Sequence, residues 1–143
     1  MVRILLVDDH PMMRGGMRQL LELEDELSVV GEAASGEEAL EVVPALQPEM
    51  ILLDLNMSGM SGVETLIKLR EMDVAAIILI VTVSDDHNDV IAAMRAGADG
   101  YILKDAEPEE LIQAVQDASK GQLTVSPQLT KALAMALRDN TAS

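Results

Sequence analysis

The chain is 143 residues long and 49% hydrophobic, with 25 acidic against 10 basic residues and a formal net charge of −15 at pH 7. The Lys and Arg residues are scattered along the sequence, so the chain lacks the clustered positive charge that direct nucleic-acid binding needs. Its length suits one compact domain. The absence of Cys excludes disulfides and thiolate chemistry, and neither a signal peptide nor an apolar stretch of about 18 residues is present to indicate export or a membrane span. We therefore expect a soluble, cytoplasmic domain.

Five short runs rich in Ile, Leu and Val predict β-strands, and each is followed by a longer segment of helical character. The runs lie at residues 3–7, 27–33, 50–54, 77–82 and 100–104. Strands that alternate with helices indicate an α/β domain with a parallel sheet. The runs at 4–7, 51–53 and 77–81 are apolar without alternation, as is typical of central strands covered on both faces.

Capping residues mark the starts of three predicted helices. Pro11 suits a first helical turn, since it has no N–H to leave unsatisfied. Ser35 with Glu38, and Ser61 with Glu64, have the spacing of a capping box, in which side chains satisfy the free N–H groups of a helix start.

The C-terminal part of the chain adds elements to this alternation. Pro108 opens a helix that Gly121 can close in a left-handed conformation. Residues 122–125 then form a short extended piece, and residues 126–143 have the pattern of a Ser-capped, Pro-started amphipathic helix. We therefore divide the chain into a domain at 1–125 and a linker helix at 126–143.

Polar residues stand where four of the five apolar runs end. They are Asp8 and Asp9, Asp54, Thr82 and Lys104. Because the carboxyl ends of parallel strands share one edge of the sheet, where ligands gather, these side chains can converge. Three carboxylates repel one another at short range, and their hard oxygen atoms favour Mg²⁺ as the compensating charge. A lysine and a threonine hydroxyl beside them can meet phosphoryl oxygens, so the set predicts a carboxylate nucleophile that receives phosphate.

This set, together with the stretches "VDDHPMMRGG", "ILLDLNMSGMSGVETL" and "GADGYILKDAEPEEL", resembles the receiver domain of two-component response regulators. The stretches are closest to the NarL/FixJ subfamily, and within it to regulators that respond to nitrate and nitrite. The resemblance covers about residues 1–125 and implies a CheY-like, flavodoxin-type fold, with a five-stranded parallel sheet and helices on both faces. It implies a phosphoacceptor that gains and loses its own phosphoryl group, rather than a turnover enzyme.

The resemblance also implies a role for each acid at this edge. Asp54 matches the phosphoacceptor, and Asp9, supported by Asp8, matches the metal-binding pair. The backbone carbonyl of Asn56 matches a further ligand of Mg²⁺. The side chains of Asn56 and Ser84 would tune how fast water removes the phosphoryl group.

Three other residues match the switch that follows phosphorylation in this family. Lys104 and Thr82 match the lysine and the hydroxyl that bind the phosphoryl oxygens, and Tyr101 matches an aromatic residue that turns when Thr82 moves. The implied partners are a sensor histidine kinase as phosphodonor, a helix-turn-helix output domain if the native chain is longer, and a second copy in a homodimer. Control of transcription would follow from the output domain.

Two positions depart from the family pattern. Ser58 and Asp105 stand where the family often has Pro, so we expect a looser turn after Asp54 and no cis peptide bond after Lys104.

Plainer interpretations stay open for single residues. Asp8 and Asp9 can be helix caps, Tyr101 can be a core filler, and His10 is read as a turn residue before Pro11. Two other classes of protein also remain. One is a receiver-like adapter that binds protein without phosphorylation, and the other is a phosphatase of the haloacid-dehalogenase kind. The phosphatase needs a second Asp two positions after the nucleophile, where this chain has Asn.

Overall fold

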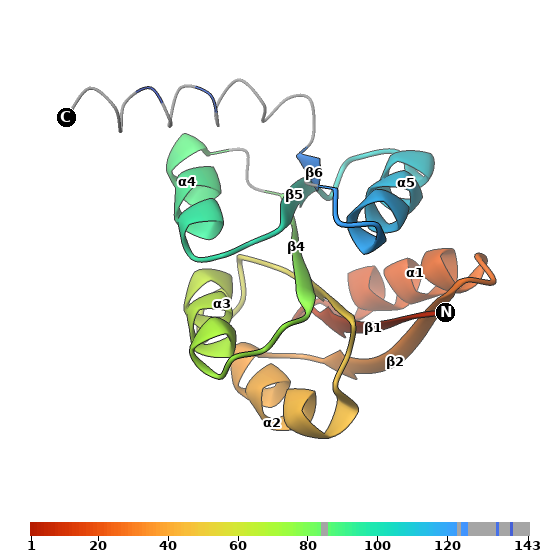
Figure 1. The fold of residues 1–143 in the computed structure, drawn as a ribbon, viewed down its shortest axis with the longest axis horizontal. Helices are drawn as coiled ribbons and strands as arrows, with labels where there is room; N and C mark the ends of the chain where they lie inside the picture. The colour runs from red at the N-terminus through yellow and green to blue at the C-terminus, as the bar shows by residue number, and fades with distance from the viewer. Residues whose placement is uncertain (84–85, 123, 126–133, 135–137, 139–143) are drawn as a thin grey trace.

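A computed structural model describes residues 1–83, 86–122, 124–125, 134 and 138 of the chain. Strands and helices alternate through this range (Figure 1). The strands are β1 (Val2–Val7), β2 (Leu27–Ala33), β3 (Met50–Leu53), β4 (Ile77–Thr82), β5 (Gly100–Leu103) and β6 (Thr124–Val125). The helices are α1 (Pro11–Glu22), α2 (Gly36–Leu46), α3 (Gly62–Glu71), α4 (His87–Arg95) and α5 (Pro108–Ser119).

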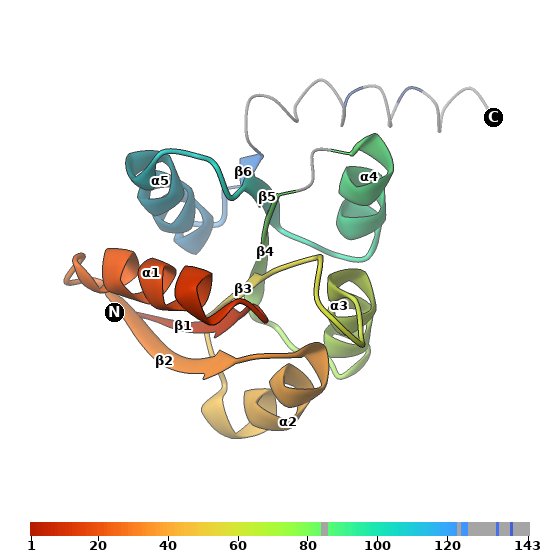
Figure 2. The ribbon, with the colours of Figure 1, turned by 180° about the vertical axis from the view of Figure 1, so that it is seen from behind.

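The strands form one parallel sheet in the order β2-β1-β3-β4-β5-β6. Helices α1 and α5 lie on one face, and α2, α3 and α4 lie on the other (Figures 1 and 2). The predicted five-stranded α/β fold is therefore confirmed, and the extended piece before residue 126 adds the short edge strand β6. The linker helix predicted at 126–143 lies outside the described residues, apart from the isolated residues 134 and 138.

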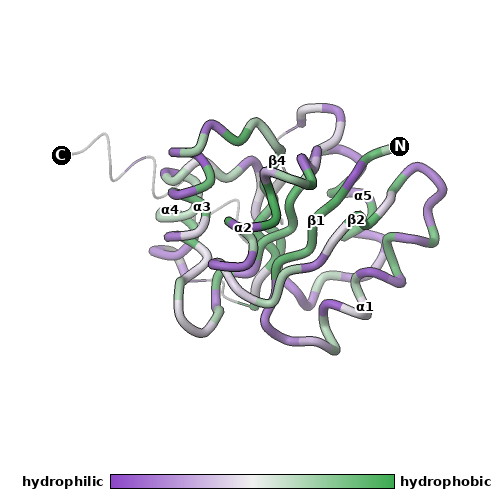
Figure 3. Tube along the Cα trace, turned by 90° about the horizontal axis from the view of Figure 1, so that it is seen from below, coloured by the Kyte–Doolittle hydropathy of each residue, from purple (hydrophilic) through white to green (hydrophobic). Residues whose placement is uncertain are grey.

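The core has two parts, one on each face of the sheet. The side chains of Met17 and Leu21 from α1 pack with Leu111 and Val115 from α5 against one face. Leu66 from α3 belongs to the second cluster, which also includes residues from α2 and α4. Seen from below in Figure 3, the central strands are the hydrophobic interior of the molecule, which explains their unbroken apolar runs.

The predicted helix starts are present. The hydroxyl oxygens of Ser35 and Ser61 each accept a hydrogen bond from the backbone N–H three residues later. Pro11 and Pro108 lie in the first turns of α1 and α5, and Gly121 takes the predicted left-handed conformation with φ of 84°. None of the helices in the described ranges combines the length and the apolar character needed to cross a membrane.

Backbone hydrogen bonds continue the sheet pattern past the strand ends. The N–H of Asp8 donates to Ala33 (3.1 Å), that of Asp54 to Val7 (3.0 Å), and that of Lys104 to Thr82 (2.7 Å). The sheet itself therefore holds the backbone of the polar residues at its carboxyl edge.

Candidate functional site

A buried lysine lies between two buried carboxylates at this edge. The side chains of Asp8 and Asp54 are 0% and 2% exposed, and that of Lys104 is 5% exposed. The Lys104 Nζ atom is 2.8 Å from Asp8 Oδ2 and 3.2 Å from Asp54 Oδ2. The predicted convergence of β1, β3 and β5 residues on one point is therefore observed.

The environment moves the pKa values of the two acids in opposite directions. Burial raises the pKa of Asp54 above its ordinary value, and the nearby Asp8 charge adds to this, although Lys104 and the Asn56 N–H act against it. Burial alone would also raise the pKa of Asp8, but the contacts from Lys104 and His10 outweigh it and the pKa is lowered. One lysine thus does not fully offset the charge of both acids, and a further cation would favour ionised Asp54.

Four residues offer the atoms that a metal ion needs. One ligand atom each from Asp8, Asp9, His10 and Asp54 lies within 4.8 Å of the others. The buried Oδ2 atoms of Asp8 and Asp54 and the Oδ1 atom of Asp9 accept no hydrogen bond of normal geometry from the described residues, although Lys104 or His10 nitrogen atoms lie nearby. Such oxygen atoms suit a hard divalent cation, so these residues fit Mg²⁺.

His10 is the residue of this cluster that the sequence analysis did not assign to the site. It is the N-cap of α1, as its expected turn position suggests, yet its Nδ1 atom also lies 2.9 Å from Asp8 Oδ1 and 3.0 Å from Asp9 Oδ1. Its backbone N–H donates to the same Asp8 Oδ1 at 2.8 Å. The signal in the sequence was its place directly after two acids and before Pro11, which keeps the chain extended there.

Asn56 joins Asp54 to the end of β4. Its backbone N–H donates to Asp54 Oδ1 at 3.2 Å, and its side-chain Nδ2 donates to the hydroxyl of Thr82 at 3.0 Å. Thr82 itself is fully buried. Thr82 and the Asn56 side chain therefore both belong to the site, whereas metal binding by the Asn56 carbonyl stays a prediction.

Tyr101 lies deeper, in the core. It is 0% exposed and pairs with Ile80 across the β4–β5 ladder. This is the position of a core filler, and its role as a switch stays a prediction. Ser84, the other residue expected to flank the site, lies outside the described residues.

The loop after β3 is tied to the site more closely than expected. The backbone N–H of Ser58 donates to Asp9 Oδ2 at 2.9 Å, a bond that Pro could not make because it has no N–H. Ser58 therefore connects the turn to Asp9, where a looser turn was predicted. No described residue has a cis peptide bond, as expected with Asp105 after Lys104.

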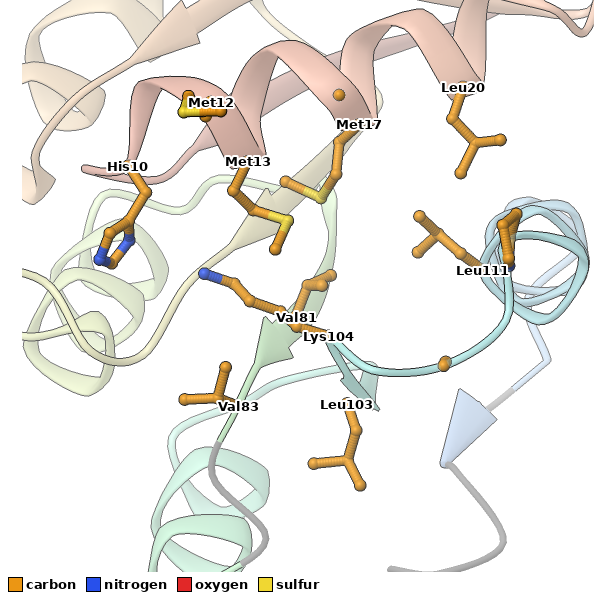
Figure 4. Close-up of a pocket in the computed structure, with 13 residues that line it drawn as sticks. His10, Met12, Met13, Met17, Leu20, Val81, Val83, Leu103, Lys104 and Leu111 are labelled. Atoms are coloured by element: carbon orange, nitrogen blue, oxygen red, sulfur yellow. The ribbon is translucent and has the colours of Figure 1, made fainter.

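A largely apolar groove opens beside the site, between α1, the ends of β4 and β5, and the start of α5 (Figure 4). Its volume is about 630 Å³. His10 and Lys104 line it, and Met12, Met13 and Met17 of α1 form one wall. Met12 is 92% exposed, and methionine side chains adapt readily to different partners. The groove therefore places exposed, adaptable methionine side chains beside the polar cluster.

Comparison with known proteins identifies the family of this chain. The response regulator receiver domain family matches residues 4–116. The chain is 49% identical over 140 residues to the nitrate/nitrite response regulator protein NarL of Escherichia coli K12, covering 98% of this chain and 65% of that protein. It is 49% identical over 131 residues to NarP of the same organism, also a nitrate/nitrite response regulator protein, covering 92% and 61%. This chain thus spans a little less than two thirds of the length of these relatives.

The solved structures agree in fold. A two-component response regulator of the LuxR family from Aurantimonas sp. SI85-9A1 superimposes with a TM-score of 0.89 at 37% identity, covering 94% of this chain and 96% of that one. The family match runs from β1 into α5 and so includes every strand end that forms the polar edge described above. This chain therefore belongs to the family of response regulator receiver domains.

Proposed function

We propose that Asp54 accepts a phosphoryl group from a phosphohistidine of a sensor kinase in a Mg²⁺-dependent reaction. The observation that carries this proposal is the buried Asp54 carboxylate held 3.2 Å from Lys104 and beside Asp8 and Asp9. A carboxylate placed in this way can act as a nucleophile beside a fixed positive charge that stabilises phosphoryl oxygens.

In the transfer, an Asp54 oxygen attacks phosphorus as the bond between phosphorus and the donor nitrogen breaks, and the electron pair of that bond returns to the donor imidazole. Asp9, Asp54 and the Asn56 carbonyl, with Asp8 in support, would hold Mg²⁺, whose charge offsets the repulsion between carboxylates and phosphoryl oxygens. Lys104 moves its ion pair from the Asp54 carboxylate to a phosphoryl oxygen.

The new phosphoryl group then biases the conformation of the domain. Thr82 turns its hydroxyl towards the phosphoryl oxygens, and the space it leaves lets Tyr101 change its side-chain conformation. The surface formed by α4, β5 and α5 changes between two states as a result. The domain also loses the phosphoryl group to water, at a rate that the Asn56 side chain tunes.

The groove beside the site is where we expect the kinase to dock. Its apolar wall on α1 suits an amphipathic helix of the partner, and its end at His10 and Lys104 brings the donor close to Asp54. Docking and chemistry would thus use adjoining surfaces.

The output is proposed from the longer relatives. Two of them are nitrate/nitrite response regulators that extend beyond the aligned part. We propose that residues 126–143 act as a linker to a helix-turn-helix domain, and that phosphorylation in the cytoplasm controls transcription in response to nitrate or nitrite, with a homodimer as the active form.

The test is the intact mass of the protein after incubation with acetyl phosphate, with and without Mg²⁺. We expect the wild type to gain one phosphoryl group only with Mg²⁺, and Asp54→Asn to gain none. Asp25→Asn, at an exposed acid, is the matched control and should behave as wild type. No gain under any condition would contradict the proposal and favour a phosphorylation-independent adapter.

A further inference from the structure

His10 presents a ring nitrogen to the carboxylate cluster from the solvent side. Its side chain is 62% exposed, while the Asp8 side chain beneath it is fully buried. The backbone N–H of His10 donates to Asp8, and this bond holds the backbone of His10 beside the cluster.

The distances from this nitrogen match those between ligands of one ion. An octahedral ion with bonds of about 2.1 Å has neighbouring ligand atoms about 3.0 Å apart and opposite ones about 4.2 Å apart. The His10 Nδ1 atom is 2.9 Å from Asp8 Oδ1, 3.0 Å from Asp9 Oδ1 and 3.8 Å from Asp54 Oδ2. The ring is thus placed to contribute to the same coordination shell as the acids.

The lysine of the site overlaps with this position at one atom. Lys104 contacts the Oδ2 atoms of Asp8 and Asp54, whereas the Oδ1 atoms of Asp8 and Asp9 lie closest to the His10 ring. A cation beside His10 would share Asp54 Oδ2 with Lys104, while the ion pair between Lys104 and Asp8 Oδ2 can persist.

Nitrogen and oxygen ligands favour different metals. Mg²⁺ prefers oxygen, whereas imidazole suits first-row transition ions, which also bind mixed nitrogen and oxygen sites more tightly in the order from Mn²⁺ to Ni²⁺. We propose that His10 is a ligand of the metal site and that it gives the site a high affinity for divalent transition ions, in addition to Mg²⁺. This inference rests on the proposed phosphoacceptor site, because it assigns a further ligand to the ion of that site.

The experiment is isothermal titration calorimetry of the full chain with MgCl₂ and with NiCl₂, in a buffer that does not chelate. We expect His10→Phe to weaken Ni²⁺ binding at least tenfold and to change Mg²⁺ binding less than about threefold, because an oxygen-preferring ion replaces the ring with water. His10→Gln, which keeps a polar side chain, should give the same result. His87→Phe is the matched control, since the chain has two histidines, and it should leave both affinities unchanged.

A second readout identifies the ligand directly. With Zn²⁺ as a diamagnetic probe, the ¹⁵N resonances of one of the two histidines should shift, and this signal should be absent in His10→Phe and present in His87→Phe. Equal weakening of Ni²⁺ and Mg²⁺ in His10→Phe would overturn the inference, because the ring would then act only by holding the acids. Unchanged Ni²⁺ binding would overturn it too, leaving His10 as a hydrogen-bond partner.

The two proposals fail in distinguishable ways. If Mg²⁺ binds and Asp54 takes up phosphate while Ni²⁺ affinity does not depend on His10, only the present inference is wrong. If the wild type shows no saturable Mg²⁺ binding and no phosphorylation, the phosphoacceptor function fails, and the inference fails with it.

Discussion

Lys104 carries the positive charge that two buried carboxylates share. Its Nζ atom lies 2.8 Å from Asp8 and 3.2 Å from Asp54, so replacing it by Met leaves both acids without their nearest cation. We predict that Lys104→Met lowers the free energy of unfolding by roughly 3 kcal/mol, because a buried charge that has lost its partner is strongly destabilising. Urea unfolding at pH 7 with EDTA present measures this loss.

Two further variants test whether the charge of Lys104, and not its bulk, stabilises the fold. Lys120→Met changes an exposed lysine and should alter stability by less than about 0.5 kcal/mol. In an Asp54→Asn background the loss from Lys104→Met should shrink, because one of the two acids is then neutral. An equal loss in both backgrounds would mean that the packing of the lysine stem, and not its charge, stabilises the site.

Gly62 allows the start of α3 to pack directly on the backbone of Asp54 and Leu55. A Cβ atom at this position would lie 2.3 Å from the carbonyl oxygen of Asp54 and 2.5 Å from the Cα of Leu55, and backbone atoms cannot move aside as a flexible side chain can. We predict that Gly62→Ala lowers the free energy of unfolding by about 1–3 kcal/mol. Chemical unfolding measures the effect, and slower uptake of phosphate from acetyl phosphate should accompany it.

Gly15 in α1 provides the matched control for this substitution. A Cβ atom there meets nothing within 4 Å, so Gly15→Ala should stabilise the protein by roughly 0.5–1 kcal/mol through helix propensity. If Gly62→Ala proved as stable as Gly15→Ala, the close approach of α3 to Asp54 would not be a constraint on the fold.

At the scale of elements, Glu32 of β2 holds α1 to the sheet. Its carboxylate binds Arg14 Nε at 2.7 Å and Arg18 Nη1 at 2.5 Å. The hydrogen bond from Arg18 lowers the pKa of Glu32 below its ordinary value of 4.5, against the effect of burial and with help from Arg14. A pKa that is lower in the folded state stabilises the fold above the unfolded pKa, and this contribution is lost as the pH falls through the folded pKa.

We therefore predict a pH-dependent cost for Glu32→Gln. The variant should be about 1 kcal/mol less stable than wild type at pH 7, and the difference should shrink as the pH falls below the unfolded pKa and through the lowered folded pKa of Glu32. Urea unfolding across this range measures it. Glu41→Gln, at an exposed acid of α2, should show little pH-dependent difference. A cost for Glu32→Gln that stayed constant down to pH 3 would rule out the ion pairs as its cause.

Strands and helix starts could be predicted because their signals are local. Apolar runs mark β1, β3 and β4, and a serine three residues before an acid marks α2 and α3. Contacts between distant elements have no such signal. Arg70 of α3, for example, donates to the carbonyls of Val74, Ala76 and Gly97, and the last of these lies 27 residues away. Such a bond depends on how the ends of α3 and α4 come together, which no local pattern records.

At the scale of the whole molecule, topology determines where the site forms. The chain places β2 and β3 on opposite sides of β1, so the connections diverge at the carboxyl ends of β1 and β3. Asp8, Asp9 and Asp54 follow these two strands, which is why their convergence could be predicted from the parallel sheet alone. The contacts of His10 and Ser58 could not, because they depend on where a ring and a loop N–H point.

The same convergence makes stability depend on a divalent cation. Ionised Asp8, Asp9 and Asp54 repel one another in the folded state and separate on unfolding, so a bound ion favours the folded chain. We predict that Mg²⁺ at ten times its Kd raises the free energy of unfolding by about 1.4 kcal/mol, which corresponds to a Tm increase of roughly 3–6 °C. Differential scanning calorimetry with MgCl₂ measures this shift.

The net charge of −15 requires a control for simple screening, since any salt weakens repulsion across the whole surface. NaCl at equal ionic strength should therefore raise the Tm of wild type and of Asp9→Asn by the same small amount. The increase in Tm from Mg²⁺ should be clearly larger than that from NaCl in wild type and only slightly larger in Asp9→Asn, because a neutral amide oxygen is a weaker Mg²⁺ ligand than a carboxylate. If the excess from Mg²⁺ were the same in both proteins, the ion would act on the surface charge as a whole and not in the cluster at the carboxyl edge.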